Sequence, residues 1–324
     1  MNLHSNTELL KDAILATAQM YGIREIYVEK DYWVTVALYE IFHSDMADQV
    51  VFKGGTALSK CHRLIARFSE DVDLVVLRET GENDNQLKKK IRTISKIVES
   101  TIPEIEIEGL TNKMGNIRKT VHQYPKLYPG DFGPIREHVV LEATWLGDSE
   151  PFSFLPVSCY ITEMMEQTGR NELIAEYKMS PFTVKVLSKE RTLCEKIMSL
   201  VRFSRTDDPI SNLRNKIRHV YDIHLMLGNE EIKSFFNSAD FEAMLVRVGK
   251  DDLVSYKNNH DWLYEHPATA MIYAQPDKTW EKIRSAYNTT FKELVTGDLP
   301  AEAELIKTLH SVEARLTKVD WNIE

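Results

Sequence analysis

The spacing of apolar positions predicts two helices and then a compact strand–helix–strand unit at the start of the chain. Apolar residues recur at helical spacing over 7–21 and again over 28–43. Residues 50–52 form a short apolar run that is typical of a buried strand, and residues 71–76 alternate with the period of a strand. A glycine pair and a short helical pattern lie between these two strands.

Further along the chain, the pattern predicts strands first and helices afterwards. The additional strands are expected at residues 105–107, 118–122, 138–145 and 182–187. The additional helices are expected at residues 86–100, 189–203, from about 213, 230–236, 239–248, 278–294 and 300–318. Residues 146–181 show no clear period, and 204–212 have the composition of a loop. This order predicts an α+β protein, with a mixed-sheet domain over 1–187 and a mostly helical domain over 188–324 that completes a ligand cleft.

Composition and charge narrow the class of protein. The chain has 324 residues, 43% hydrophobic and 27% charged, which is typical of globular proteins. No apolar run approaches the roughly 18 residues of a membrane-spanning helix, and the N-terminus lacks a signal-peptide pattern, so we expect a cytoplasmic protein with no membrane partner. The three cysteines have unrelated spacings, which predicts buried thiols and neither disulfides nor a zinc site.

The net charge of −9 is not typical of a nucleic-acid-binding protein, although a local basic groove can act within an acidic one. Basic residues cluster within 88–92, 113–119 and 202–218. Clusters of this kind more often form a solvated surface than a binding groove.

The unit at residues 50–76 places a glycine turn next to two aspartates. Gly54 and Gly55 open a helix whose first turn presents free backbone N–H groups, where a phosphate can bind. Asp71 and Asp73 are two residues apart on the next strand, so both carboxylates point to one face. Carboxylate oxygens beside a phosphate suit Mg²⁺, and a pair of cations can hold the attacking and leaving oxygens of a phosphate transfer. The spacing matches neither a P-loop nor the dinucleotide-binding fingerprint.

Two later charged residues admit two interpretations each. Glu142 follows an apolar run in a predicted strand, where a lone carboxylate faces solvent or acts as a third metal ligand beside Asp71 and Asp73. Lys196 lies at the edge of the apolar stripe of its helix. Its stem could simply cover apolar surface while the charge stays in water, or the ammonium group could reach a cleft.

Two pairs of charged residues lie on predicted helices. Lys30 and Asp31 stand near the start of the second predicted helix, where the helix dipole stabilises acidic residues. The alternative is that both lie beneath the nucleotide site. Arg218 and Asp222 are four residues apart on one helix, which is the spacing of a helical ion pair.

Four motifs together resemble a known family. They are E-K-D-Y-W at 29–33, K-G-G-T-A-L at 53–58, R-F-S-E-D-V-D at 67–73, and the late pair E-K at 195–196 with R-H-V-Y-D at 218–222. The glycine turn, helix and D-x-D resemble the first motif of the nucleotidyltransferase superfamily of DNA polymerase β type. The whole set is more closely similar to the AbiEii/AbiGii toxin family of nucleotidyltransferase-like proteins. The resemblance spans about residues 29–225, and the last hundred residues match only as a helical region.

The resemblance implies a nucleotidyltransferase-like mixed sheet with a C-terminal helical bundle, and it implies roles for individual residues. Gly54, Gly55, Thr56 and Ser69 would bind the triphosphate, and Thr56 stands where many members have serine. Asp71 and Asp73 would bind Mg²⁺, and one of them would help to deprotonate the acceptor. Lys196 would neutralise charge on the triphosphate, and Asp222 would position Lys196 or the acceptor. Glu142 has no firm counterpart in the family.

The implied activity is Mg²⁺-dependent transfer of a nucleoside monophosphate from an NTP to an acceptor, with release of pyrophosphate. Some relatives modify the acceptor end of tRNA, so the expected acceptor is the 3′ end of tRNA. The expected setting is a toxin–antitoxin or phage-defence system (abortive infection), with a cognate antitoxin as partner. The alternatives are transfer to a protein or small-molecule hydroxyl, and a non-catalytic nucleotide-binding module.

Overall fold

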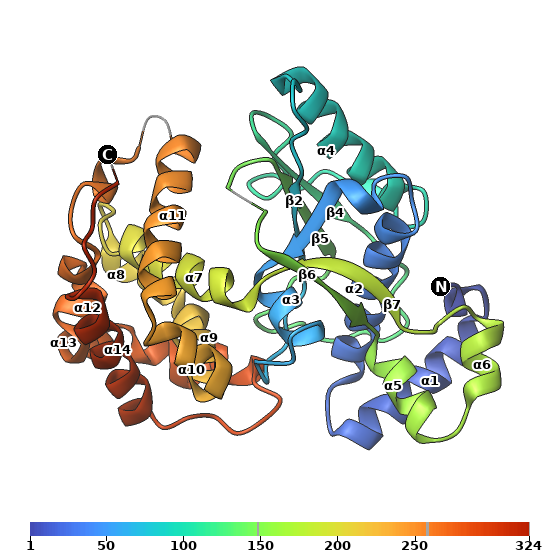
Figure 1. Cartoon of the computed structure of the whole chain (residues 1–324). Helices are drawn as coiled ribbons and strands as arrows, with labels where there is room; N and C mark the ends of the chain where they lie inside the picture. Colours follow the sequence, from blue (N-terminus) through green and yellow to red (C-terminus); the bar gives the residue numbers. More distant parts are fainter. Residues whose placement is uncertain (148, 257–258, 324) are drawn as a thin grey trace. The chain divides into compact units, whose positions relative to one another are not determined.

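The chain folds into two units in the computed structural model, which describes residues 1–147, 149–256 and 259–323. The first unit consists of Met1–His62, Phe68–Trp145 and Phe152–Leu187. The second consists of Arg63–Arg67, Leu146–Pro151 and Ser188–Glu324. Figure 1 labels the α-helices and most of the strands of the two units.

A seven-stranded mixed sheet forms the core of the first unit, which confirms the α+β prediction. Its strand order is β3-β4-β5-β2-β1-β7-β6. The strands are β1 (Val50–Lys53), β2 (Asp71–Val76), β3 (Glu104–Ile105), β4 (Ile117–His122), β5 (Val139–Thr144), β6 (Phe152–Val157) and β7 (Phe182–Leu187). β2 is parallel to β5 and antiparallel to β1, and β1 is parallel to β7. The predicted strands β1, β2, β4, β5 and β7 are confirmed to within one residue.

Six α-helices accompany the sheet in the described part of this unit. They are α1 (Thr7–Tyr21), α2 (Glu25–Phe42), α3 (Gly54–Lys60), α4 (Asp84–Glu99), α5 (Tyr160–Gln167) and α6 (Asn171–Glu176). α4 begins at a capping box between Asn83 and Gln86, and its apolar side is buried. Arg118 of β4 donates from Nε to Ser95 Oγ of α4 at 2.7 Å. α4 therefore covers the face of the sheet that carries Arg118, and its neighbour Lys119 points to the opposite face.

The start of α2 corrects the dipole interpretation of the charged run at residues 29–31. α2 begins at Glu25, so Glu29, Lys30 and Asp31 lie in its second turn, and all three are buried. Glu29 accepts hydrogen bonds from the N–H groups of Leu127 and Tyr128, at 2.6 and 3.2 Å. The three charges therefore bind other segments of the unit, and they do not lie at an exposed helix end.

Several short elements were missed by the sequence pattern. β6, α5 and α6 lie within 146–181, and α8 (Pro209–Asn215) occupies part of the predicted loop. β6 is an edge strand whose positions are mostly exposed or half-buried, so it lacks the alternation of a central strand. α8 begins with Asp208 as N-cap and Pro209 in its first turn, and both residues are also common in loops. The helical pattern after the glycine pair includes Leu64 and Ile65, but α3 ends at Lys60.

The second unit is helical, as predicted. After α7 (Lys189–Phe203) and α8, its helices are α9 (Ile217–Gly228), α10 (Glu230–Phe236), α11 (Ala239–Ser255), α12 (Met271–Ala274), α13 (Pro276–Ala286) and α14 (Glu302–Leu316). Ser188 caps α7 by accepting from the N–H of Arg191, and Leu193, Ile197 and Leu200 form the buried stripe that the pattern predicted.

Two predictions from composition can also be compared with the structure. Cys61, Cys159 and Cys194 are buried free thiols, as expected. Among the helices in the described part of the chain, none combines the length and the apolar character needed to cross a bilayer.

Candidate active site

Four charged side chains form a row across the central strands of the sheet. Lys53 of β1 lies opposite Asp73 of β2, Asp73 lies opposite Glu142 of β5, and Glu142 lies opposite Lys119 of β4. Residues opposite one another in a sheet point to the same face, so the row reads cation, carboxylate, carboxylate, cation. Asp71 precedes Asp73 by two residues and shares that face, as predicted.

Gly54 brings the glycine turn directly against Asp73. Its φ is +82°, a conformation that other residues rarely adopt, and a Cβ at this position would lie 2.3 Å from Asp73 Oδ2. Both constraints require glycine. The glycine turn and the D-x-D strand, which are about twenty positions apart in the sequence, are therefore parts of one site.

The carboxylate of Asp73 is half-buried among other charges. Burial and the charges of Asp71 and Glu142 raise the pKa of Asp73 to about 7, although Lys53 and Lys119 oppose the shift. No hydrogen bond to this carboxylate occurs within residues 1–147, 149–256 and 259–323. A further cation beside Asp73 would stabilise its ionised form, so this position suits a metal ion or another positive group.

Asp71 has a close partner that the sequence pattern did not reveal. Arg136, in the loop between β4 and β5, donates from Nη1 to Asp71 Oδ1 at 2.9 Å and to Oδ2 at 3.0 Å. The same Nη1 is 3.6 Å from Glu70 Oε1. Arg136 belongs to a non-periodic segment and is more than sixty residues from Asp71, so no local signal identifies the contact.

The two hydroxyl residues of the proposed phosphate site contact each other. Thr56 Oγ1 donates to Ser69 Oγ at 3.0 Å, and the Thr56 side chain is fully buried. Ser69 is half-buried. Gly55 and Thr56 lie in the first turn of α3, where backbone N–H groups lack helical acceptors. The backbone of Thr56 and the hydroxyl of Ser69 are thus better placed for a ligand than the Thr56 hydroxyl.

Glu142 combines features of both interpretations. It shares the face of Asp73 and lies opposite it, as a third acidic group would. It is also half-exposed and forms an ion pair with Lys119, whose Nζ is 3.4 Å from Glu142 Oε2. This ion pair is sufficient to explain a charged residue in the strand without a metal.

Lys196 and Asp222 form a buried ionic cluster in the second unit together with Arg67. Asp222 Oδ2 is 2.6 Å from Lys196 Nζ and 2.8 Å from Arg67 Nη2, and its Oδ1 accepts from Arg67 Nε at 2.6 Å. Burial alone would raise the pKa of Asp222, but the two cations outweigh it and hold this pKa well below the usual range. Among the described residues these two are the cations that bind Asp222, so the predicted helical pair with Arg218 is wrong.

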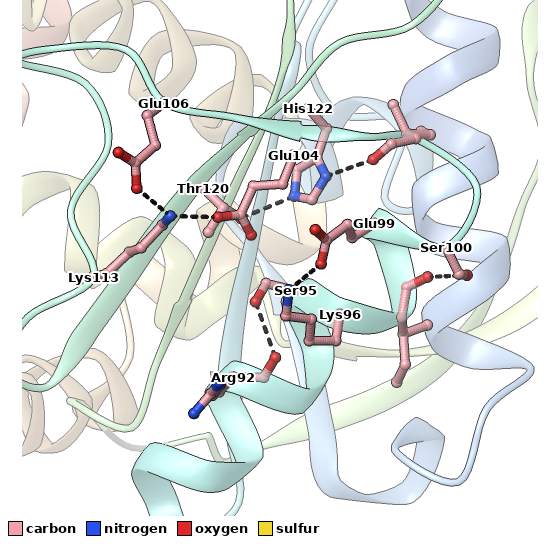
Figure 2. Close-up of polar contacts among 12 residues, drawn as sticks. Arg92, Ser95, Lys96, Glu99, Ser100, Glu104, Glu106, Lys113, Thr120 and His122 are labelled. Carbon is pink, nitrogen blue, oxygen red and sulfur yellow. Dashed lines mark hydrogen bonds and ion pairs between the residues drawn. The ribbon is translucent and has the colours of Figure 1, made fainter.

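Two of the basic segments form ion pairs inside the first unit. Lys113 Nζ lies 2.7 Å from Glu104 Oε1 and 2.6 Å from Glu106 Oε1 (Figure 2), and Lys90 Nζ lies 2.7 Å from Glu82 Oε1. His122, in the same view, is buried between Thr120 and the carbonyl of Ile102. These charges are neutralised locally, which weakens the case for the 113–119 segment as a groove for nucleic acid.

The residues present fit a magnesium ion with few protein ligands. No group of three or more His, Cys, Asp or Glu residues is arranged to hold a metal within the described part of the chain. Asp71 and Asp73 nevertheless offer hard carboxylate oxygens on one face. Mg²⁺ typically takes one or two carboxylates and completes its shell with water and substrate phosphates, so a two-carboxylate site suits it.

The fold and this site define a nucleotidyltransferase-type core. Comparison with protein families matches residues 36–313 to the family described as "Nucleotidyl transferase AbiEii toxin, Type IV TA system". The match covers most of the chain, and the protein belongs to this family of toxins from type IV toxin–antitoxin systems. Membership confirms the resemblance inferred from the motifs. It classes the protein as a nucleotidyltransferase, with an NTP substrate and an antitoxin partner implied.

A solved structure supports the fold independently. The chain is similar to MenT4, a nucleotidyltransferase toxin from Mycobacterium tuberculosis H37Rv, with a TM-score of 0.61 and 15% sequence identity. The similarity covers 95% of this chain and 90% of that one. At this identity the likeness establishes the fold alone. None of the curated proteins matches the chain significantly in sequence.

Proposed function

We propose that the protein transfers a nucleoside monophosphate from an NTP to an acceptor hydroxyl at the Asp71–Asp73 face of the sheet, with release of pyrophosphate. The observation that carries this proposal is the approach of Gly54 to Asp73, where a Cβ would lie 2.3 Å from the carboxylate. That approach joins a turn suited to phosphate with two carboxylates suited to a divalent cation.

In this proposal Asp71 and Asp73 hold Mg²⁺, and Glu142 is the third acidic group of the site. The ion, when bound, supplies positive charge that stabilises the phosphates. Asp71 or Asp73 accepts the proton of the acceptor hydroxyl at one of its oxygens. The remaining catalytic effect comes from positioning and from charge neutralisation.

The other residues of the proposed site bind the triphosphate. Gly54, Gly55 and Thr56 contribute backbone N–H groups, and Ser69 contributes its hydroxyl. Lys196 neutralises charge on the triphosphate. Its ammonium group is held by Asp222 at 2.6 Å, which supports the role of Asp222 as the residue that positions Lys196.

We further propose the 3′ end of tRNA as the acceptor, in a toxin–antitoxin or phage-defence setting. This choice rests on the family resemblance, whereas the net charge of −9 favours a protein or small-molecule acceptor. Incubation with α-labelled NTPs and Mg²⁺, with total RNA and total protein as separate acceptors, distinguishes them. We expect label at the ends of tRNA with the wild type and none with Asp71→Ala. Label in the protein fraction alone would refute the tRNA acceptor, and tight NTP binding without turnover on any acceptor would indicate a binding module.

A further inference from the structure

Arg136 stands beside the proposed site with part of its guanidinium free. Its Nη1 binds both oxygens of Asp71, at 2.9 and 3.0 Å. Among the described residues, no hydrogen-bond partner occurs for its Nε or Nη2, and 35% of the side chain is exposed. A guanidinium with free donors in a planar fork can bind two phosphate oxygens at once, which suits it to phosphate recognition.

The backbone of Arg136 is held on both sides by a buried ion pair. Its N–H donates to Glu70 Oε1 and Oε2, at 3.1 and 2.9 Å. Its carbonyl accepts from Lys30 Nζ at 2.7 Å, and Lys30 also binds the carbonyl of His138. Lys30 Nζ lies 3.2 Å from Glu70 Oε2, and the two side chains are 0% and 5% exposed.

Lys30 and Glu70 differ from an isolated surface ion pair because both are buried and both also bind the main chain. Burying a charged pair costs desolvation energy, which is recovered only when further hydrogen bonds satisfy both groups. Here those hydrogen bonds are made with the main chain of Arg136. The buried pair therefore holds the backbone of Arg136 in a fixed position next to Asp71. The Arg136 side chain remains partly exposed to solvent.

We propose that Arg136 binds the phosphates of the nucleotide and that Lys30 and Glu70 are the positioning residues that present it. The inference rests on the proposed function for the place where the nucleotide binds. Arg136 is a fixed cation of the first unit, so it binds triphosphate before and independently of any metal ion. Lys30 and Glu70 act on the nucleotide only through Arg136.

The test measures nucleotide affinity without turnover. Each of the four NTPs, and the corresponding nucleosides, is titrated in EDTA by calorimetry against wild type, Arg136→Ala, Arg136→Lys and Arg92→Ala. Arg92 is an exposed arginine of α4 and controls for the loss of one positive charge. A charge-assisted hydrogen bond is worth enough that we expect Arg136→Ala to weaken NTP binding by about 10-fold or more. We expect the NTP affinity of Arg136→Lys to lie between those of wild type and Arg136→Ala. Arg92→Ala should change NTP affinity by less than about 2-fold. Nucleoside affinities should change by less than about 2-fold in all variants.

Glu70→Gln tests the positioning role. It should weaken NTP binding in the wild-type background and have no further effect on NTP affinity when combined with Arg136→Ala, because both changes act through one group. Purely structural damage would lower affinity by the same factor in both backgrounds. Additive effects of this kind would refute the positioning role.

The outcomes separate the two proposals. If wild type binds NTP and Arg136→Ala binds it equally well, the inference about Arg136 is refuted and the proposed function stands. If wild type binds no NTP in EDTA but binds it with Mg²⁺, Arg136 does not act independently of the metal and the inference is again refuted. If wild type binds no NTP under either condition, both proposals fail.

Discussion

Gly54 is under two separate constraints at the scale of single residues. Its φ of +82° disfavours any side chain, and its close approach to Asp73 leaves no room for one. Gly81 provides a matched comparison because its φ is +88° and a Cβ there would meet nothing within 4 Å. The two glycines share the backbone strain and differ in the contact with the site.

We predict that Gly54→Ala abolishes nucleotidyl transfer, whereas Gly81→Ala leaves it near the wild-type level. Gly81→Ala should lower the free energy of unfolding by about 1–2 kcal/mol, because it places a side chain in a left-handed conformation. Gly54→Ala should lower it by more, because its Cβ would also lie 2.3 Å from Asp73 Oδ2. Activity assays and thermal melts of the two variants make the comparison. Equal activities would show that the contact with Asp73 has no functional role.

Asp222 balances two buried cations, Arg67 and Lys196, so its removal affects stability as well as chemistry. We predict that Asp222→Asn lowers the free energy of unfolding by about 3–5 kcal/mol, because both cations lose a buried counter-charge. Arg67→Met should lower the free energy of unfolding by less, because Lys196 and Asp222 remain paired. Denaturant titrations measure both. A stable Asp222→Asn protein would contradict this account, and a loss of its activity could then be assigned to catalysis.

The pH dependence of this cluster has a definite sign. The pKa of Asp222 is lower in the folded state than in the unfolded chain, so its contribution to stability is complete above the unfolded pKa of about 4. That contribution is lost as pH falls further, toward the folded pKa. We predict that stability below about pH 4 falls more steeply in the wild type than in Asp222→Asn, as measured by urea unfolding at pH 2–6. Parallel curves would contradict the lowered pKa.

The site residues that lie within one short motif could be predicted from the sequence. Asp71, Asp73 and the glycine pair lie in one such unit, and alternation alone placed both carboxylates on one face. Arg136 and Glu70 were missed because their contacts join a loop to a strand across long sequence separations. The partner of Asp222 was wrong for a related reason, since local helical spacing suggested Arg218 and the fold supplies Arg67 instead.

At the scale of elements, α2 connects several segments through buried charges. Asp31 Oδ1 lies 2.5 Å from Lys60 Nζ of α3, and its Oδ2 accepts from the N–H of Tyr160, the first residue of α5, at 2.8 Å. Glu29 and Lys30 bind the loop between β4 and β5. The helix thus fixes the segments next to the site by hydrogen bonds as well as by apolar packing.

We predict that Asp31→Asn destabilises the protein by about 3 kcal/mol, because Lys60 then lacks a buried counter-charge. Asp12→Asn on the exposed side of α1 should change stability by less than about 0.5 kcal/mol. Urea unfolding of the two variants tests the difference. Similar small effects would show that the buried pair is not structurally important.

Elements were predictable in proportion to their burial. The central strands β2 and β5 have strong apolar patterns because most of their positions are buried. The edge strand β6 and the short helices α6 and α8 each bury a single residue, so their sequences carry little periodicity. α5 buries four of its eight residues, but it is too short to show several helical repeats.

At the scale of the whole molecule, the units do not follow the order of the chain. Arg67 precedes the D-x-D strand by four residues, yet the segment Arg63–Arg67 belongs to the second unit. There the carbonyl of Ala66 accepts from the N–H of Thr296, and Arg67 binds Asp222. The R-F-S-E-D-V-D motif is therefore shared between the two units, which no pattern within a single segment can reveal.

The central claim is that Asp71 and Asp73 carry nucleotidyl transfer. The most direct test is pyrophosphate release from NTPs with total RNA as acceptor, for wild type, Asp71→Ala, Asp73→Ala and the control Gly81→Ala. We expect release by wild type and control, and a loss of at least about 100-fold in both aspartate variants with unchanged circular dichroism. Wild-type rates of release from either aspartate variant in its native fold would contradict it.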